Sequence, residues 1–230
     1  MLTFAPWDFM LQAYVDDQGL VNYGRWRQES MTLLTDWLAE LQTVAVADLP
    51  SEEHLAFWLN LYNALMVQEV LLRYPIASIR PKILGIPNWL GLLALLSRPV
   101  YQVNGETLSL NRIEHHKLRA IFGDPRIHFA LVCASLGCPI LRNEAYLPAI
   151  VEAQLDTDAQ RFLNHPDKVR YDADRNILYC SKIFQWYKED FLTVSPSIAA
   201  YVAQYNPQVP KTATVRYLPY NWSLNQQVAS

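Results

Sequence analysis

The residues with the most reactive side chains gather in one short stretch of the sequence. His128, Cys133 and Cys138 lie within it, and they include two of the three cysteines of the chain. A cysteine thiolate is a nucleophile and a metal ligand, and a nearby histidine can act as its general base. The stretch therefore predicts thiol chemistry or metal binding. The alternative is that both cysteines pack as small apolar residues.

The elements around this stretch decide where the two thiols point. Residues 127–133 are apolar and partly β-branched, which predicts a buried strand that ends at Cys133. Side chains alternate along a strand, so His128 and Cys133 are expected on opposite faces. Cys138 precedes Pro139, a residue favoured in the first turn of a helix. We therefore predict that Cys138 is a helix N-cap with a stabilised thiolate, and that it is alkylated before the other cysteines.

A second ionisable group precedes these residues. Glu114, His115 and His116 follow a predicted helix start at Ser109 or Asn111. Adjacent residues diverge by about 100° on a helix, so only one of the two histidines is expected to face a shared site. We expect it to be His115, with Glu114 beside it as an orienting acid.

One helix is predicted to form the centre of the fold. Residues 51–74 begin with a serine and two glutamates, end before a proline, and are apolar nearly all round. Its polar and aromatic members form two groups, Asn60 with Asn63 on one face and His54 with Trp58 on another. Two interpretations are open: the amides hydrogen-bond neighbouring backbone, or Asn60 and His54 line a pocket that faces the cysteines.

The remaining patterns predict a single α+β domain over residues 1–230, mostly helical around a small β-sheet. Asn104-Gly105 between two short β-rich runs is a strong hairpin signal. A second hairpin is predicted within 169–179. Further helices are predicted at 8–15, 26–44, 148–163, 183–191 and 196–205.

Composition limits the classes of function. The chain is 51% hydrophobic and 18% charged with a net charge of −3, and it lacks a dense basic cluster, so we expect a globular protein that does not bind nucleic acid. The start of the chain lacks the features of a signal peptide, and three cysteines fit a reducing compartment, so we expect a cytoplasmic protein in which Cys133 and Cys138 can pair reversibly. The stretch 83–96 is too short to span a bilayer, so no membrane span is expected.

Taken together, the motifs resemble the bacterial and plant family known as domain of unknown function 547. The resemblance rests on blocks that cover most of the chain: YVDDQGLVNY at 14–23, HLAFWLNLYNALMV at 54–67, SLNRIEHHKLR at 109–119, DPRIHFALVCASLGCP at 124–139, then SKIFQWYKEDF and YLPYNWSLN. The last block has Asn221 where the family is expected to have an aspartate. The family name implies no activity, but it places the candidate residues at motif positions.

Three hypotheses for function follow. The first is a thiol-dependent hydrolase or acyl/peptidyl transferase with a cysteine nucleophile and a histidine base. The second is a non-catalytic domain that binds a small molecule or peptide in a groove lined by some of its 13 tyrosines and 7 tryptophans. The third is a zinc site made by both cysteines with His115 or His128. No cofactor fingerprint is present in the sequence. The catalytic candidates are Cys138, His115, Glu114, Cys133 and His128, and the binding candidates are His54, Trp58, Asn60, Asn63 and Ser135.

Overall fold

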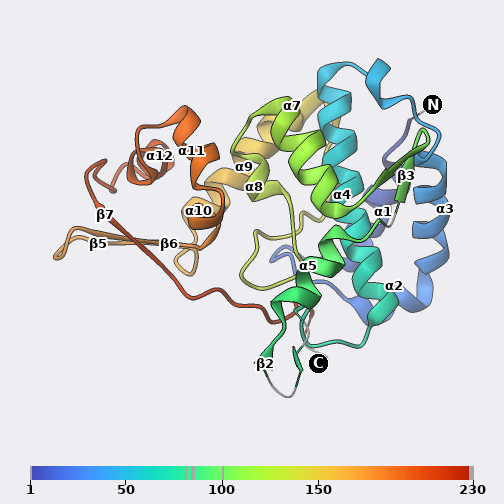
Figure 1. Cartoon of the computed structure of the whole chain (residues 1–230), viewed down its shortest axis with the longest axis horizontal. Helices are drawn as coiled ribbons and strands as arrows, with labels where there is room; N and C mark the ends of the chain where they lie inside the picture. The colour runs from blue at the N-terminus through green and yellow to red at the C-terminus, as the bar shows by residue number, and fades with distance from the viewer. Residues whose placement is uncertain (1, 81, 84–85, 100, 228–230) are drawn as a thin grey trace.

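The computed structural model describes residues 2–80, 82–83, 86–99 and 101–227, and it is α+β and mostly helical, as predicted (Figure 1). Its helices are α1 (Ala5–Tyr14), α2 (Tyr23–Glu29), α3 (Met31–Leu41), α4 (Ser51–Arg73), α5 (Trp89–Ser97), α6 (Leu110–Arg112), a π-helix (Ile113–Arg119), α7 (Ala120–Phe122), α8 (Ile127–Ala130), α9 (Val151–Leu163), α10 (Ile183–Trp186), α11 (Lys188–Val194) and α12 (Ile198–Tyr205), with 3₁₀ turns at Val46–Asp48 and Pro148–Ile150. Its strands are β1 (Lys82–Ile83), β2 (Ile86–Pro87), β3 (Tyr101–Val103), β4 (Glu106–Leu108), β5 (Val169–Asp172), β6 (Ile177–Cys180) and β7 (Thr214–Tyr217).

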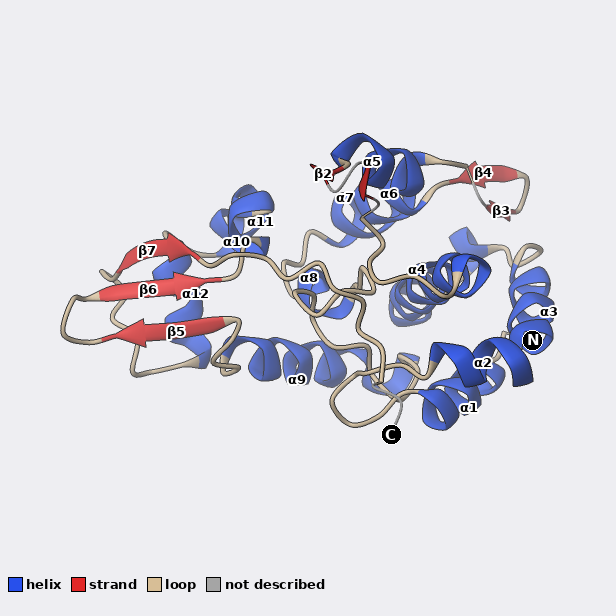
Figure 2. Ribbon diagram, turned by 90° about the horizontal axis from the view of Figure 1, so that it is seen from below, coloured by secondary structure: helices blue, strands red, loops and turns tan. Residues whose placement is uncertain are grey.

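Helix α4 is the centre of the larger hydrophobic core, which confirms the prediction for residues 51–74. Both Trp58 and Asn60 are buried, as expected for a helix that is apolar on all sides. Helices α1, α2 and α3 pack around it, as Figure 2 shows. By length and composition α4 passes the test for a membrane-spanning helix, but 89% of its apolar window is buried inside the protein, as in a core helix. The stretch 83–96 lies partly outside the described residues, and the rest of it contains β2 and α5.

A second, smaller core lies between α9, helices α10 to α12 and the sheet of β5, β6 and β7 (Figure 2). Its centre is a cluster of aromatic rings that includes Phe129, Phe184, Phe191 and Tyr201, with ring centroids of Phe184 and Phe191 4.6 Å apart. Phe129 belongs to α8, so this short helix joins the second core to the first.

Both predicted hairpins are present. Strands β3 and β4 pair antiparallel, and Asn104 and Gly105 between them have φ values of 47° and 80°. Two successive residues with positive φ are what a type I′ turn requires, and asparagine and glycine tolerate them best. Strands β5 and β6 form the second hairpin, and β7 joins β6 in parallel.

The predicted strand 127–133 is wrong. Residues 127–130 form the single-turn helix α8, which is capped by Leu131, a residue with extended backbone geometry. The Asp124 carboxylate accepts the backbone N–H of Arg126 at 2.8 Å and so begins a turn, after which helical bonding continues. A short apolar run that is buried all round has no periodicity that distinguishes a strand from a helix. The predicted helix 26–44 is likewise divided, because Ser30 leaves helical geometry between α2 and α3.

Candidate functional site

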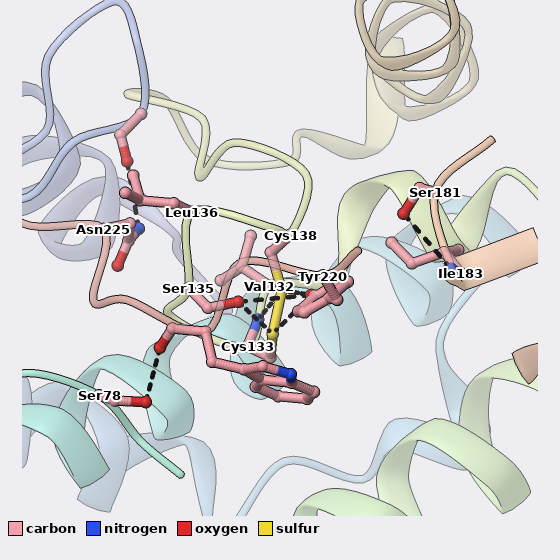
Figure 3. Close-up of a disulfide and its surroundings, with 12 residues drawn as sticks. Ser78, Val132, Cys133, Ser135, Leu136, Cys138, Ser181, Ile183, Tyr220 and Asn225 are labelled. Atoms are coloured by element: carbon pink, nitrogen blue, oxygen red, sulfur yellow. Dashed lines mark hydrogen bonds between the residues drawn. A yellow bond between two sulfur atoms is a disulfide. The ribbon is translucent and has the colours of Figure 1, made fainter. Parts of the chain in front are cut away.

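Cys133 and Cys138 form a disulfide, with their Cα atoms 6.1 Å apart (Figure 3). The pairing that we expected to be reversible is therefore present in this state of the protein. The predicted N-cap at Cys138 is wrong, since no helix begins at Pro139. Instead, residues 135–138 form a turn in which the N–H of Cys138 donates to the carbonyl of Ser135 at 3.0 Å.

The C-terminal segment holds this cysteine loop in place. The N–H of Leu136 donates to the carbonyl of Ser223 at 2.8 Å, and the N–H of Gly137 donates to the carbonyl of Asn221 at 2.7 Å. A Cβ atom added to Gly137 would lie 2.7 Å from a ring carbon of Tyr220. The loop therefore needs glycine at this position to approach the segment so closely.

Tyr220 is a member of the site that the sequence did not single out, although it lies in the family-like block YLPYNWSLN. Its hydroxyl lies 3.0 Å from Sγ of Cys138, 3.2 Å from Sγ of Cys133 and 3.4 Å from Oγ of Ser135 (Figure 3). Burial raises the pKa of Tyr220 well above its usual value, although the hydrogen bond with Ser135 opposes the shift. The phenol is therefore a neutral hydrogen-bond donor to sulfur.

Cys138 receives a second donor from its own loop. The backbone N–H of Cys133 points at Sγ of Cys138 over 2.9 Å. Cys138 is buried, whereas Cys133 is half-buried. The backbone donor that we expected from a helix end comes instead from Cys133.

The disulfide lines a cavity of about 170 Å³ that brings together four of the five catalytic candidates: Glu114, His128, Cys133 and Cys138. The rest of its wall is aromatic and aliphatic and includes Tyr62, Leu131, Trp186, Tyr187, Tyr220 and Trp222. His115, the favoured base, is not among the residues that line it. It is exposed and its Nδ1 contacts the guanidinium of Arg119.

His128 is held by a charged pair from another part of the chain. Its Nε2 lies 2.7 Å from Oδ2 of Asp190, and its ring stacks on Tyr187 with centroids 3.9 Å apart. Arg119 donates two hydrogen bonds to the same carboxylate, at 2.6 and 2.7 Å. The hydrogen bond from His128 and then those from Arg119 lower the pKa of Asp190 far below its usual value. The carboxylate is therefore ionised and orients the imidazole.

Glu114 is a buried carboxylate on the π-helix, an element that is frequent at functional sites. Its Oε2 accepts a hydrogen bond from the Tyr62 hydroxyl at 3.4 Å, and the phenol of Tyr187 also hydrogen-bonds to it. Burial and then the charge of Glu114 raise the pKa of Tyr62, and the same effects raise that of Tyr187. Tyr62 and Tyr187 are therefore neutral phenols beside Glu114.

The side-chain amides of the two asparagines of α4 hydrogen-bond backbone groups and do not line this cavity. This agrees with the first of the two interpretations given above, in which these amides bond to backbone. Asn63 donates to the carbonyl of Ala130 at 2.9 Å and accepts the N–H of Val132 at 3.0 Å. Asn60 makes the same pair of bonds with the backbone of Tyr146, at 2.8 and 2.9 Å. Asn63 therefore fixes the segment that leads directly to the cysteine loop.

The other binding candidates have different positions. His54 and Trp58 lie outside the cavity, where the His54 ring meets Phe122 edge to face at 5.5 Å and Lys117 lies over the Trp58 ring. Burial and then the charge of Lys117 lower the pKa of His54. Ser135, by contrast, is buried with its Oγ 3.1 Å from Sγ of Cys133.

A metal centre is not supported by this arrangement. Across the described part of the chain, no group of three or more histidine, cysteine or acidic side chains lies close enough to hold a metal ion. The two sulfurs that the zinc hypothesis needs are bonded to each other, and His115 points elsewhere.

Comparison with known proteins agrees with the motif resemblance. A curated relative, "Contactin rig-6" of Caenorhabditis elegans, is 28% identical over 138 residues, which is 55% of this chain and 11% of that protein. The chain thus spans about a tenth of the relative's length. No solved structure matches. The model of the family described as "Protein of unknown function, DUF547" matches residues 46–163, half of the chain, and the protein belongs to this family.

Proposed function

We propose that the protein is a cysteine-dependent enzyme of the hydrolase or acyl/peptidyl-transferase class, in which Cys138 is the nucleophile of the reduced form. The observation that carries the proposal is the pair of donors on Sγ of Cys138, the N–H of Cys133 at 2.9 Å and the hydroxyl of Tyr220 at 3.0 Å. Hydrogen bonds to a charged group favour the charged form, so this environment stabilises a thiolate over a thiol.

His128 is the base in this proposal. Neutral imidazole has one donor and one acceptor nitrogen, so an Nε2–H that donates to Asp190 leaves Nδ1 as the proton acceptor. Such a pairing of an acid with a histidine is how a base is oriented beside a nucleophile. His128 and Cys138 line the same cavity, which replaces our earlier choice of His115.

The chemical steps need a reduced cysteine pair. A thiol reductant first cleaves the Cys133–Cys138 bond and is itself oxidised. His128 takes the proton of the freed Cys138 thiol, and the resulting thiolate attacks a carbonyl carbon and forms a thioester, while that proton passes from His128 to the departing amine or alcohol. His128 then takes a proton from water, or from an amine acceptor in a transferase, as it attacks the thioester, so that the acid or amide leaves and the Cys138 thiolate is released. A cavity of about 170 Å³ with aromatic walls suits a small acyl group or side chain.

A second candidate is a binding domain without catalysis, and the aromatic wall of the cavity favours it. The rings of Tyr220 and Trp222 are 4.6 Å apart, and Trp186 lies 4.8 Å from Tyr220. Such rings provide large, rigid apolar contact for a small molecule or a peptide side chain. In this alternative Cys133 and Cys138 fix the loop and do not react.

Iodoacetamide labelling near pH 7, read by peptide mass spectrometry, distinguishes the two. After mild reduction, Cys138 is expected to be labelled before Cys133, and both before Cys180, because burial raises the pKa of Cys180 to about 12. Tyr220→Phe removes one donor to the thiolate, a loss of about 1.5 kcal/mol, and is expected to slow labelling of Cys138 roughly tenfold. Tyr171→Phe, which removes a hydroxyl bonded only to Asn176 among the contacts described, is the matched control.

The base is tested in the same assay. His128→Gln is expected to slow labelling of Cys138 and to abolish hydrolysis of small thioesters, whereas His115→Gln leaves both unchanged. Equal, slow labelling of all three cysteines after reduction would contradict the proposed enzymatic function and leave a binding domain as the better explanation.

A further inference from the structure

A larger cavity, of about 850 Å³, lies next to the site and has no part in the proposed thiol chemistry. Its described lining residues come from the end of α4, the segment that follows it, α5 and the C-terminal segment. Three of them, Ile79, Tyr220 and Trp222, also line the smaller cavity, so the two hollows share a wall.

Positive charge is concentrated on this cavity. Arg73, Arg80 and Arg98 line it, and none of its described lining residues is acidic. Glu69, which is buried behind them with a side chain 5% exposed, orients two of the three. Its carboxylate accepts Nη2 of Arg98 at 2.8 and 3.0 Å and also Nη1 of Arg73.

Two of these arginine side chains line the cavity and remain partly exposed. The side chains of Arg73 and Arg98 are 37% and 52% exposed although both contact Glu69. Arg73 and Arg98 share the single carboxylate of Glu69, so this pair retains an excess of one positive charge. Guanidinium groups held in place by a buried acid are suited to bind a carboxylate or phosphate through two parallel hydrogen bonds.

Apolar side chains form much of the rest of the wall, together with the polar residues Ser78, Asn221 and Ser223. Ile76, Ile79, Ala94 and Leu95 line the cavity between the arginines and the C-terminal segment. The guanidinium carbon of Arg80 lies 5.0 Å from the centre of the Trp222 ring. Figure 3 shows Ser78, whose hydroxyl donates to the carbonyl of Trp222 at 2.6 Å, so the two segments that form this wall are bonded to each other.

We propose that this cavity binds an anionic group attached to an apolar chain, with the carboxylate or phosphate on Arg73 and Arg98 and the chain along the aliphatic wall. The excess of positive charge favours an anionic group, and the aliphatic and aromatic lining favours an apolar chain attached to that group. Carboxylic acids with an alkyl chain and peptides with an apolar C-terminal residue share this chemistry. The site does not depend on the cysteines.

Isothermal titration calorimetry with octanoate, octanamide and acetate tests the proposal on the intact protein. Octanoate is expected to bind at least about tenfold more tightly than octanamide, which lacks the charge, and than acetate, which lacks the chain. N-acetyl-Leu-Leu-Val with a free carboxylate, compared with its C-terminal amide, tests the peptide source. Tighter binding of octanoate than of the peptide identifies an alkyl acid, and the reverse identifies a peptide end. Equal binding of each acid and its amide would overturn the proposal.

Variants of Arg98 test whether this side chain binds the carboxylate of octanoate. Arg98→Gln is expected to weaken octanoate binding about tenfold, and Arg98→Lys, which keeps a cation beside Glu69, is expected to weaken it less. Arg25→Gln, at an exposed pair with Glu29 on α2, is the matched control. Cys133→Ser/Cys138→Ser is expected to bind octanoate as the unaltered protein does, so failure here and failure of the thiol chemistry are separate results. Unchanged affinity in both Arg98 variants would refute the assignment.

Discussion

Asn63 is the residue through which α4 is expected to control the cysteine loop, and its replacement by alanine gives the sharpest test of how the site is held. The side chain is buried and makes two hydrogen bonds, with the carbonyl of Ala130 at 2.9 Å and the N–H of Val132 at 3.0 Å. Asn63→Ala leaves both backbone groups buried without this partner. Each such group costs about 1–3 kcal/mol, so we expect the free energy of unfolding to fall by about 2–6 kcal/mol. That is a large share of the 5–15 kcal/mol typical of a whole domain.

Urea unfolding followed by circular dichroism measures this loss. Asn164→Ala, which removes an exposed amide bonded to the carbonyl of Gln160, is the matched control and is expected to change the free energy of unfolding by less than about 0.5 kcal/mol. Asn60→Ala is expected to cost as much as Asn63→Ala, because Asn60 bonds the backbone of Tyr146 in the same way. Only Asn63→Ala, however, is expected to slow the labelling of reduced Cys138. A loss below about 1 kcal/mol for Asn63→Ala would refute the reasoning.

Three further predictions follow from the contacts around the loop. Gly137→Ala places a Cβ atom 2.7 Å from the Tyr220 ring, so we expect a loss of about 1–3 kcal/mol in urea unfolding and slower labelling of reduced thiols. The pKa of Asp190 is lowered chiefly by His128, so its ionised form stabilises the fold above the ordinary aspartate pKa of about 4 and this contribution is lost as the pH falls below that value. The free energy of unfolding of Asp190→Asn should therefore depend less on pH between 5 and 2 than that of the native protein. An unchanged pH dependence would contradict the pairing of Asp190 with His128. Burial lowers the pKa of Lys168 to about 8, so between about pH 8 and 10 the folded state binds fewer protons than the unfolded chain. The free energy of unfolding should therefore rise with pH over this range in the native protein. It should not rise in this way in Lys168→Met.

The elements that could be predicted from the sequence are those that carry their own local signal. Helix α4 has a clear start, a proline after its end and an unbroken apolar composition, so its position and its burial both follow. The hairpin of β3 and β4 follows from Asn104-Gly105, because that dipeptide accepts the two positive φ values of the turn. The pairing of Cys133 with Cys138 was an open alternative, since a gap of four residues permits both pairing and separate roles.

The errors have physical causes. The run 127–133 is buried on all sides, so hydrophobicity alone did not distinguish α8 from a strand. Glu114 and His115 were assigned together because they are adjacent in the sequence. Adjacent residues on a helix point in different directions, and here Glu114 lies inside while His115 is exposed. A shared site therefore needs residues from different elements.

Those residues could not be identified from one sequence. Asp190 is 62 residues from His128, and Tyr220 is 82 residues from Cys138. Neither has a local pattern that indicates its partner, because both are ordinary polar residues near aromatic ones. Only the packing of α11 against α8, and of the C-terminal segment against the cysteine loop, brings them to the site.

The family match contains only some of the residues of the site, so a fragment limited to the match would lack the others. Residues 46–163 contain Cys138 and His128, but the partners that give these side chains their proposed properties, Asp190 and Tyr220, lie beyond that range. In a fragment limited to the match, the Cys138 sulfur would keep only the donor from its own loop, and the imidazole would lose its carboxylate. Phe129 would also lose most of the aromatic cluster that buries it, since Phe184, Phe191 and Tyr201 come from α10, α11 and α12. The chemistry proposed for this protein is consequently a property of residues on both sides of the match boundary, and it requires the segments that carry Asp190 and Tyr220.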